Sequence, residues 1–97
     1  MGIEYRISVV PTDGIATGDV DAMLKRLRNF SDFDANTGNY NYRTDPAVTD
    51  GMPDASISIE PDHFYFCAYG GHAAKDTLGA LIAKLCSHNR TVSIREL

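Results

Sequence analysis

The sequence has no tryptophan and only two cysteines, Cys67 and Cys86, which lie far apart in its 97 residues. A disulfide framework needs more cysteines and a metal site needs clustered ligands. We therefore expect two reduced thiols in a cytoplasmic protein that uses no metal or other cofactor. No apolar run approaches the roughly 18 residues of a membrane-spanning helix, so we do not expect a membrane protein.

Basic residues are also scarce. Nine Lys and Arg residues stand against 13 Asp and Glu residues, and the formal net charge is −4. Binding to a nucleic-acid backbone or to an anionic membrane surface needs clustered basic side chains, so we expect neither partner. Catalytic signatures such as GxSxG, HExxH and CxxC do not occur in the sequence. We therefore expect a protein that is not an enzyme.

The acidic residues are concentrated in the middle of the chain. Residues 29–62 contain seven acids and one base, Arg43, so this segment alone carries a charge of −6. A basic partner would be attracted by such uneven charge, which speeds association and orients the encounter. The length of the chain fits a single domain that covers residues 1–97.

Four stretches alternate apolar and polar residues, as half-buried strands do: residues 3–9, 56–60, 63–69 and 91–96. Two other segments have apolar residues at helical spacing. The first follows a cap at Thr17 or Asp19, and the second begins after Gly70-Gly71 and ends at His88-Asn89. A turn over residues 35–38 and the pair Tyr40 and Tyr42 predict one extra short edge strand.

This order, β-α-β-β-α-β with an extra short edge strand, predicts an α+β protein with the ferredoxin-like two-layer sandwich. Its sheet is expected to be mostly antiparallel, with both helices on one face. The residues expected to point into the core are Ile3, Tyr5, Ile7, Val9, Ile57, Ile59, Phe64, Phe66, Val92 and Ile94. The residues expected on the opposite, open face are Glu4, Arg6, Ser8, Ser58, Glu60, His63, Tyr65, Cys67, Tyr69, Ser93 and Arg95.

The leading functional hypothesis is a small acidic protein-binding module of the inhibitor, immunity or adaptor type. It would contact another protein, with basic character, through the acidic segment 31–54, the open sheet face, or both. Tyrosine and arginine are the residue types that contribute most to interfaces, so the face is a good candidate. The candidate partner-binding residues are Asp32, Asp34, Asp50, Asp54, Arg6, Tyr65 and Tyr69.

Two alternatives remain open. The first is a small-ligand-binding domain with an anion site at the start of the second helix, because the free N–H groups of a helix N-terminus attract anions. The loop after the first strand is expected at the same end of the sheet as that site. The candidate ligand-binding residues are Thr12, Asp13, Gly70, Gly71, His72 and Lys75. The second alternative is a structural homodimer that forms through the open face.

Overall fold

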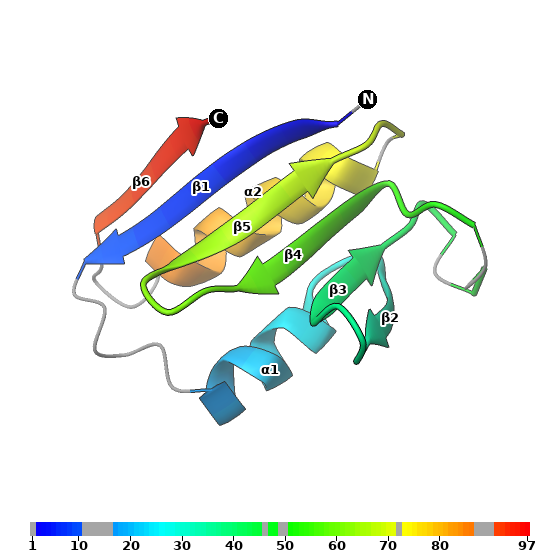
Figure 1. Ribbon diagram of the computed structural model, residues 1–97, viewed down its shortest axis with the longest axis horizontal. Helices are drawn as coiled ribbons and strands as arrows, with labels where there is room; N and C mark the ends of the chain where they lie inside the picture. Colours follow the sequence, from blue (N-terminus) through cyan, green and yellow to red (C-terminus); the bar gives the residue numbers. More distant parts are fainter. Residues whose placement is uncertain (1, 11–16, 46, 49–50, 72, 87–90) are drawn as a thin grey trace.

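The computed structural model describes residues 2–10, 17–45, 47–48, 51–71, 73–86 and 91–97 (Figure 1). It shows an α+β fold with a six-stranded sheet and two helices. The elements in chain order are β1 (Ile3–Val10), α1 (Thr17–Arg26), β2 (Phe30–Asp34), β3 (Asn39–Tyr42), β4 (Ala55–Ile59), β5 (His63–Ala68), α2 (Ala73–Cys86) and β6 (Thr91–Glu96).

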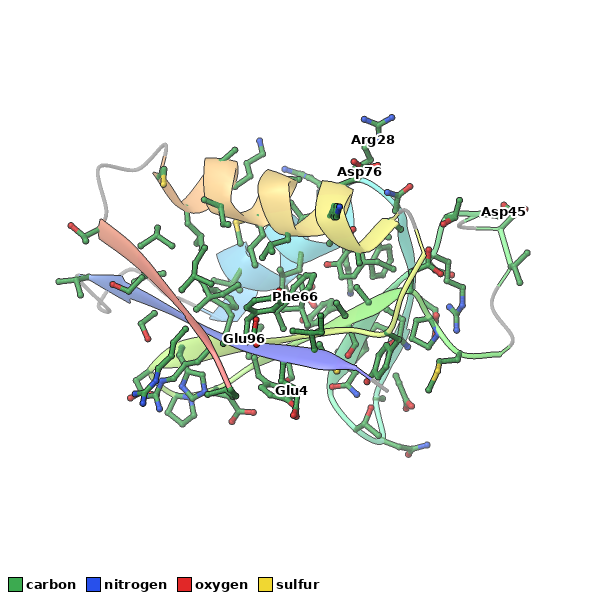
Figure 2. All side chains as sticks on the ribbon, turned by 90° about the horizontal axis from the view of Figure 1, so that it is seen from above. Glu4, Arg28, Asp45, Phe66, Asp76 and Glu96 are labelled. Carbon is green, nitrogen blue, oxygen red and sulfur yellow. The ribbon has the colours of Figure 1, made fainter. Side chains whose placement is uncertain are left out.

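The strands follow the order β2-β3-β4-β5-β1-β6, and all five neighbouring pairs are antiparallel. Strands β2 to β5 are consecutive in the chain, whereas β1 lies between β5 and β6. Both helices lie on the same side of the sheet, with Phe66 between the layers and Glu4 on the opposite side (Figure 2). The expected α+β class, with an antiparallel sheet and both helices on one face, is therefore confirmed.

The core lies between the sheet and the helices. The side chains of Ile7, Ile57 and Phe66 have no exposed surface, as their alternation with polar neighbours predicts. From the helices, Leu24 of α1 and Leu81 of α2 are equally buried. One face of the sheet is therefore covered by the helices. The other face is open and carries the polar side chains that alternate with these apolar residues.

Two predicted core residues are exposed. Ile3 keeps 50% and Ile94 46% of its surface accessible, although the register places both on the helix side of the sheet. Ile3 begins β1, and Ile94 lies on β6, the outermost strand, where most residues are exposed. Alternation identifies the face of a residue, but it does not show how far the helices extend over the sheet.

Cys67 is less exposed than its predicted place on the open face suggested. It lies on the open face, since it is directly opposite Glu4 in the sheet, yet it is buried. Gly2 covers it so closely that a Cβ on Gly2 would lie 2.9 Å from the Cys67 sulfur. The start of the described chain therefore shields this thiol.

The middle of the chain forms two additional strands, whereas one edge strand was predicted. Strand β2 was missed because Phe30 continues the helical spacing of Leu27 and was read as part of the first helix, and because a register shift falls between Phe30 and Asp32. Asn29 turns the chain out of the preceding helix with a φ of 73°, a conformation that asparagine tolerates. As a result β3 is an inner strand, and its residues Tyr40 and Tyr42 are buried.

The expectation that the loops after the first strand and after Tyr69 lie at one end of the sheet is wrong. Strands β1 and β5 are antiparallel neighbours, so Val10 ends β1 at the end of the sheet opposite to Ala68. Thr12 and Asp13 follow Val10 and lie outside the described residues. The candidate site at the start of α2 must therefore be built without them.

The hydroxyl group of Tyr42 ties β3 to α1. It donates a hydrogen bond of 2.7 Å to the backbone carbonyl of Leu24, and Tyr42 has no exposed surface. Burial raises the pKa of this hydroxyl, and the nearby Tyr40 raises it further. Tyr42 therefore stays protonated and remains a donor at any physiological pH.

We expect Tyr42→Phe to lower the free energy of unfolding by about 1 kcal/mol, because it removes one buried hydrogen bond and keeps the ring. The matched control is Tyr5→Phe, since the Tyr5 hydroxyl has no hydrogen bond within the described part of the chain. Urea unfolding measures both variants. Equal midpoints for the two variants would contradict a stabilising role for this bond.

Candidate functional site

The open face is organised in rows that cross the sheet. Directly opposed residues share a face, so one row connects Arg6 on β1, Tyr65 on β5 and Ser58 on β4. The same row continues through Asn39 to Asp34 at the far edge. The predicted residues Arg6, Tyr65 and Asp34 therefore lie on one surface.

The polar side chains of this face hold one another in place. The Tyr65 hydroxyl donates to the Glu4 carboxylate. Arg6 forms an ion pair of 3.3 Å with Asp62, whose other oxygen lies 2.6 Å from Nδ1 of His63. The hydrogen bond from His63 and, to a lesser degree, the charge of Arg6 lower the pKa of the Asp62 carboxyl. These contacts form two separate groups on the face, Tyr65 with Glu4 and Arg6 with Asp62 and His63.

Tyr69 follows strand β5 at the end of the sheet. Its hydroxyl is 3.4 Å from the hydroxyl of Ser56, which is buried on the neighbouring strand. Tyr69 also lines a pocket beside the start of α2. The two sites predicted from the sequence, the open face and the ligand site, therefore adjoin at this residue.

Two acids of the middle segment have internal partners. Asp32 pairs with Arg43, which is 93% buried and also donates 2.8 Å hydrogen bonds to the Ser31 hydroxyl and the Gly51 carbonyl. Asp34 accepts a 2.9 Å hydrogen bond from the backbone N–H of Asn36 and so stabilises the turn between β2 and β3. Asp50 lies outside the described residues.

The third described acid of the predicted set, Asp54, caps α2. Its carboxylate accepts hydrogen bonds from the backbone N–H of Ala73, at 3.3 Å, and from the Thr44 hydroxyl. A Cβ on Gly71 would collide with this carboxylate, and the positive φ of 82° at Gly71 also favours glycine. The negative charge that a helix N-terminus attracts is therefore supplied by the chain itself.

A pocket of about 270 Å³ opens between the start of α2 and the neighbouring ends of β1 and β5. Three of the predicted ligand residues, Gly70, Gly71 and Lys75, line it, whereas His72 lies outside the described residues. Its other lining residues are mainly apolar: Ile3, Tyr5, Ala68, Tyr69, Ala74 and Leu78. The pocket thus offers an apolar wall and one flexible cation.

Ile3 and Tyr5 were expected in the core, and their part in this pocket was not predicted. Their signal was the same apolar periodicity that marks core residues. Only the exposure of Ile3 at the start of β1 distinguishes them, and exposure depends on where α2 begins over the sheet.

Two other classes of site have no support in the described part of the chain. No three His, Cys, Asp or Glu side chains there are grouped so as to hold a metal ion. Within the same residues, no helix has the length and apolar character to cross a membrane.

No protein-family model, curated protein or solved structure matches this chain. The function must therefore be argued from the two surfaces described above.

We expect Asp54→Ala to lower the free energy of unfolding by about 1 kcal/mol, the usual cost of losing a helix cap. Asp54→Asn should lose less, because the amide oxygen still accepts the hydrogen bond from Ala73. Glu96→Ala, which removes an exposed acid from the edge strand, is the control. Thermal unfolding of the three variants would refute the cap if Asp54→Ala and Glu96→Ala had the same midpoint.

Proposed function

We propose that this chain is a protein-binding module of the inhibitor, immunity or adaptor type, and that its partner docks on the open sheet face. The observation that carries the proposal is the position of both helices on one side, which leaves the opposite face uncovered (Figure 2). Arg6, Tyr65 and Tyr69 belong to that face. Arginine and tyrosine are the side chains that most often dominate binding energy.

Two side-chain contacts on this face favour binding. Ordering a side chain at an interface costs free energy, and a residue that is already held in place avoids part of that cost. Tyr65 is held by Glu4, and Arg6 is held by Asp62. These contacts reduce the conformational freedom that Tyr65 and Arg6 lose when a partner covers them.

The acidic segment supports a partner with basic character. Asp32 and Asp34 lie on the same face as Arg6 and Tyr65, at the β2 edge of the sheet. In this proposal they attract a basic partner and orient it, whereas Asp54 is used within the fold as a helix cap. The partner would thus meet an acidic edge beside a tyrosine-containing centre.

We further propose that the domain is a ferredoxin-like sandwich with a two-strand insertion. Four strands support this, because β4, β5, β1 and β6 are adjacent in that order, and α1 and α2 follow β1 and β5 in the chain. The insertion is the pair β2 and β3, which extends the sheet beyond β4. This topology leaves the residues Arg6, Tyr65 and Tyr69 uncovered by the helices.

The test is affinity capture from the cells that make the protein, with the wild type and variants as bait. Arg6→Glu and Tyr65→Ala should each weaken binding of the captured partner roughly tenfold or more, the effect of removing a hot-spot residue. Raised salt should also weaken binding of the partner to the wild type. Arg28→Glu, a charge reversal at an exposed residue that follows α1, is the matched control.

Thermal unfolding must show that each variant folds before its binding is compared. A partner that binds all three variants as tightly as the wild type would place the interface elsewhere and overturn the proposal.

The pocket favours a second candidate function, the binding of a small molecule. Its apolar walls and Lys75 would suit a ligand with an apolar body and one anionic group. The Lys75 side chain is exposed and has no ion-pair partner in the described part of the chain, so it is free to meet such a group. Because Asp54 already caps α2, Lys75 rather than the helix N-terminus would supply the positive charge.

We expect a short-chain fatty acid to raise the unfolding temperature of the wild type, since a ligand that binds only the folded state stabilises it. The rise should disappear in Lys75→Gln and persist in the control Arg28→Gln. A series of carboxylates of increasing chain length, followed by thermal unfolding, measures this effect. No stabilisation by any member of the series would exclude this class of ligand.

A further inference from the structure

Within the described part of the chain, the sheet ends at strand β2 on one side and strand β6 on the other, and each pairs with only one neighbouring strand. Edge strands present unpaired backbone N–H and C=O groups, which can pair with a strand of another chain. Because all five strand pairs are antiparallel, β2 and β6 run in opposite directions (Figure 1). A second copy shifted along the sheet would therefore bring its β2 antiparallel to β6, with the helices of both copies on the same side.

The two edges carry opposite charges on the open face. At the β6 edge, Arg95 lies directly opposite Arg6. Arg6 is paired with Asp62, whereas Arg95 has no ion-pair partner in the described part of the chain. At the β2 edge, the same face carries Asp32 and Asp34. Asp32 is already paired with Arg43, whereas Asp34 has no ion-pair partner among the described residues. Arg95 of one edge is thus complementary in charge to Asp34 of the other.

The two edges also match on the helix side. Ile94 keeps 46% of its surface exposed in β6, and Phe33 keeps 40% exposed in β2. The register places both on the side of the helices, Ile94 opposite Ile7 and Phe33 opposite Tyr40. Each edge strand therefore exposes one large apolar side chain next to its charged residues.

The backbone hydrogen bonds define which residues would meet. The N–H of Leu97 donates to the carbonyl of Glu4 at 2.8 Å, and since the direction of these groups alternates along a strand, those of Ile94 point away from β1. The carbonyl of Asp34 accepts from Gly38 at 2.7 Å, so by the same alternation the groups of Phe33 point away from β3. Ile94 and Phe33 can then form a hydrogen-bonded pair.

We propose that this chain self-associates head to tail, with β6 of one copy paired antiparallel to β2 of the next. In this register Ile94 lies opposite Phe33 of the next copy and Arg95 lies opposite its Asp32, within diagonal reach of its Asp34. A heterologous contact of this kind leaves one free edge at each end of the assembly. It therefore produces a range of sizes that grows with concentration.

Charge argues against the symmetric alternative, in which β6 pairs with β6 of a second copy. That arrangement would bring two copies of Arg95 close together on one face, and like charges that lie close together across strands are destabilising. The head-to-tail arrangement places an acid there instead. The contact is short, because β2 has a register shift and its Ser31 hydroxyl is bound to the Val48 carbonyl. We therefore expect weak association that salt disrupts.

Sedimentation velocity over a series of concentrations at low salt tests the proposal. The average mass of the wild type should rise above the 10.6 kDa of one chain as concentration increases, and raised salt should reverse the rise. Arg95→Glu and Asp34→Lys should each remain at the mass of one chain. An equimolar mixture of the two variants should associate again, because each opposing edge then carries the complementary charge.

Two further variants keep this result interpretable. Arg28→Glu changes the same charge away from both edges and should associate like the wild type. Asp34→Asn retains the side-chain oxygen that stabilises the turn and loses only the charge. If Asp34→Lys does not fold, Asp34→Asn replaces it as a single variant, which should associate less than the wild type, and the mixture is not used. The proposal is overturned by a wild type of constant mass, by a mixture that does not associate, or by stronger association of Arg95→Glu alone, which would indicate the symmetric β6 contact.

Discussion

The carboxylate and backbone of Asp54 connect strand β3, the end of strand β5 and the start of helix α2. Its N–H donates to the Tyr42 carbonyl on β3, and its own carbonyl accepts from Tyr69 after β5. Its side chain caps α2 through Ala73. One residue thus connects strand β3, the β4–β5 hairpin and the second helix. The start of α2 next to it forms one wall of the pocket. The geometry of both candidate sites depends on this connection.

The role of Asp54 also explains why Gly71 is a glycine. The carboxylate lies so close to Gly71 that a side chain there would displace it, and the backbone conformation favours glycine as well. In the sequence, Gly70-Gly71 indicated a helix start with a free anion site, and Asp54 indicated a contact for a partner. In the structure the Asp54 carboxylate lies next to Gly71 and caps α2, so the chain itself supplies the negative charge that the start of this helix attracts.

The sequence predicted the parts of the fold that local periodicity determines. Alternation identified β1, β4, β5 and β6, and helical spacing identified α2, because in each case one face is buried against the same core. The strand β2 was not predicted, since its apolar residues are irregularly spaced around a register shift. The internal partners of Asp32 and Asp54 were not predictable either, because Arg43 and Ala73 are more than ten residues away from them and meet them only through tertiary packing.

These internal partners also change how the charge of the protein is interpreted. The net charge of −6 in residues 29–62 suggested an uncompensated acidic surface, yet Asp32 is paired with a buried arginine and Asp54 caps a helix. Among the described residues, the open face instead has Asp34 at the β2 edge and Arg95 at the β6 edge, both without an ion-pair partner. A contact between sheet edges leaves this face uncovered, so self-association and partner binding are compatible. Each added copy would align another open face beside the first, and several weak contacts with a partner that has repeated sites would then add up to tight binding.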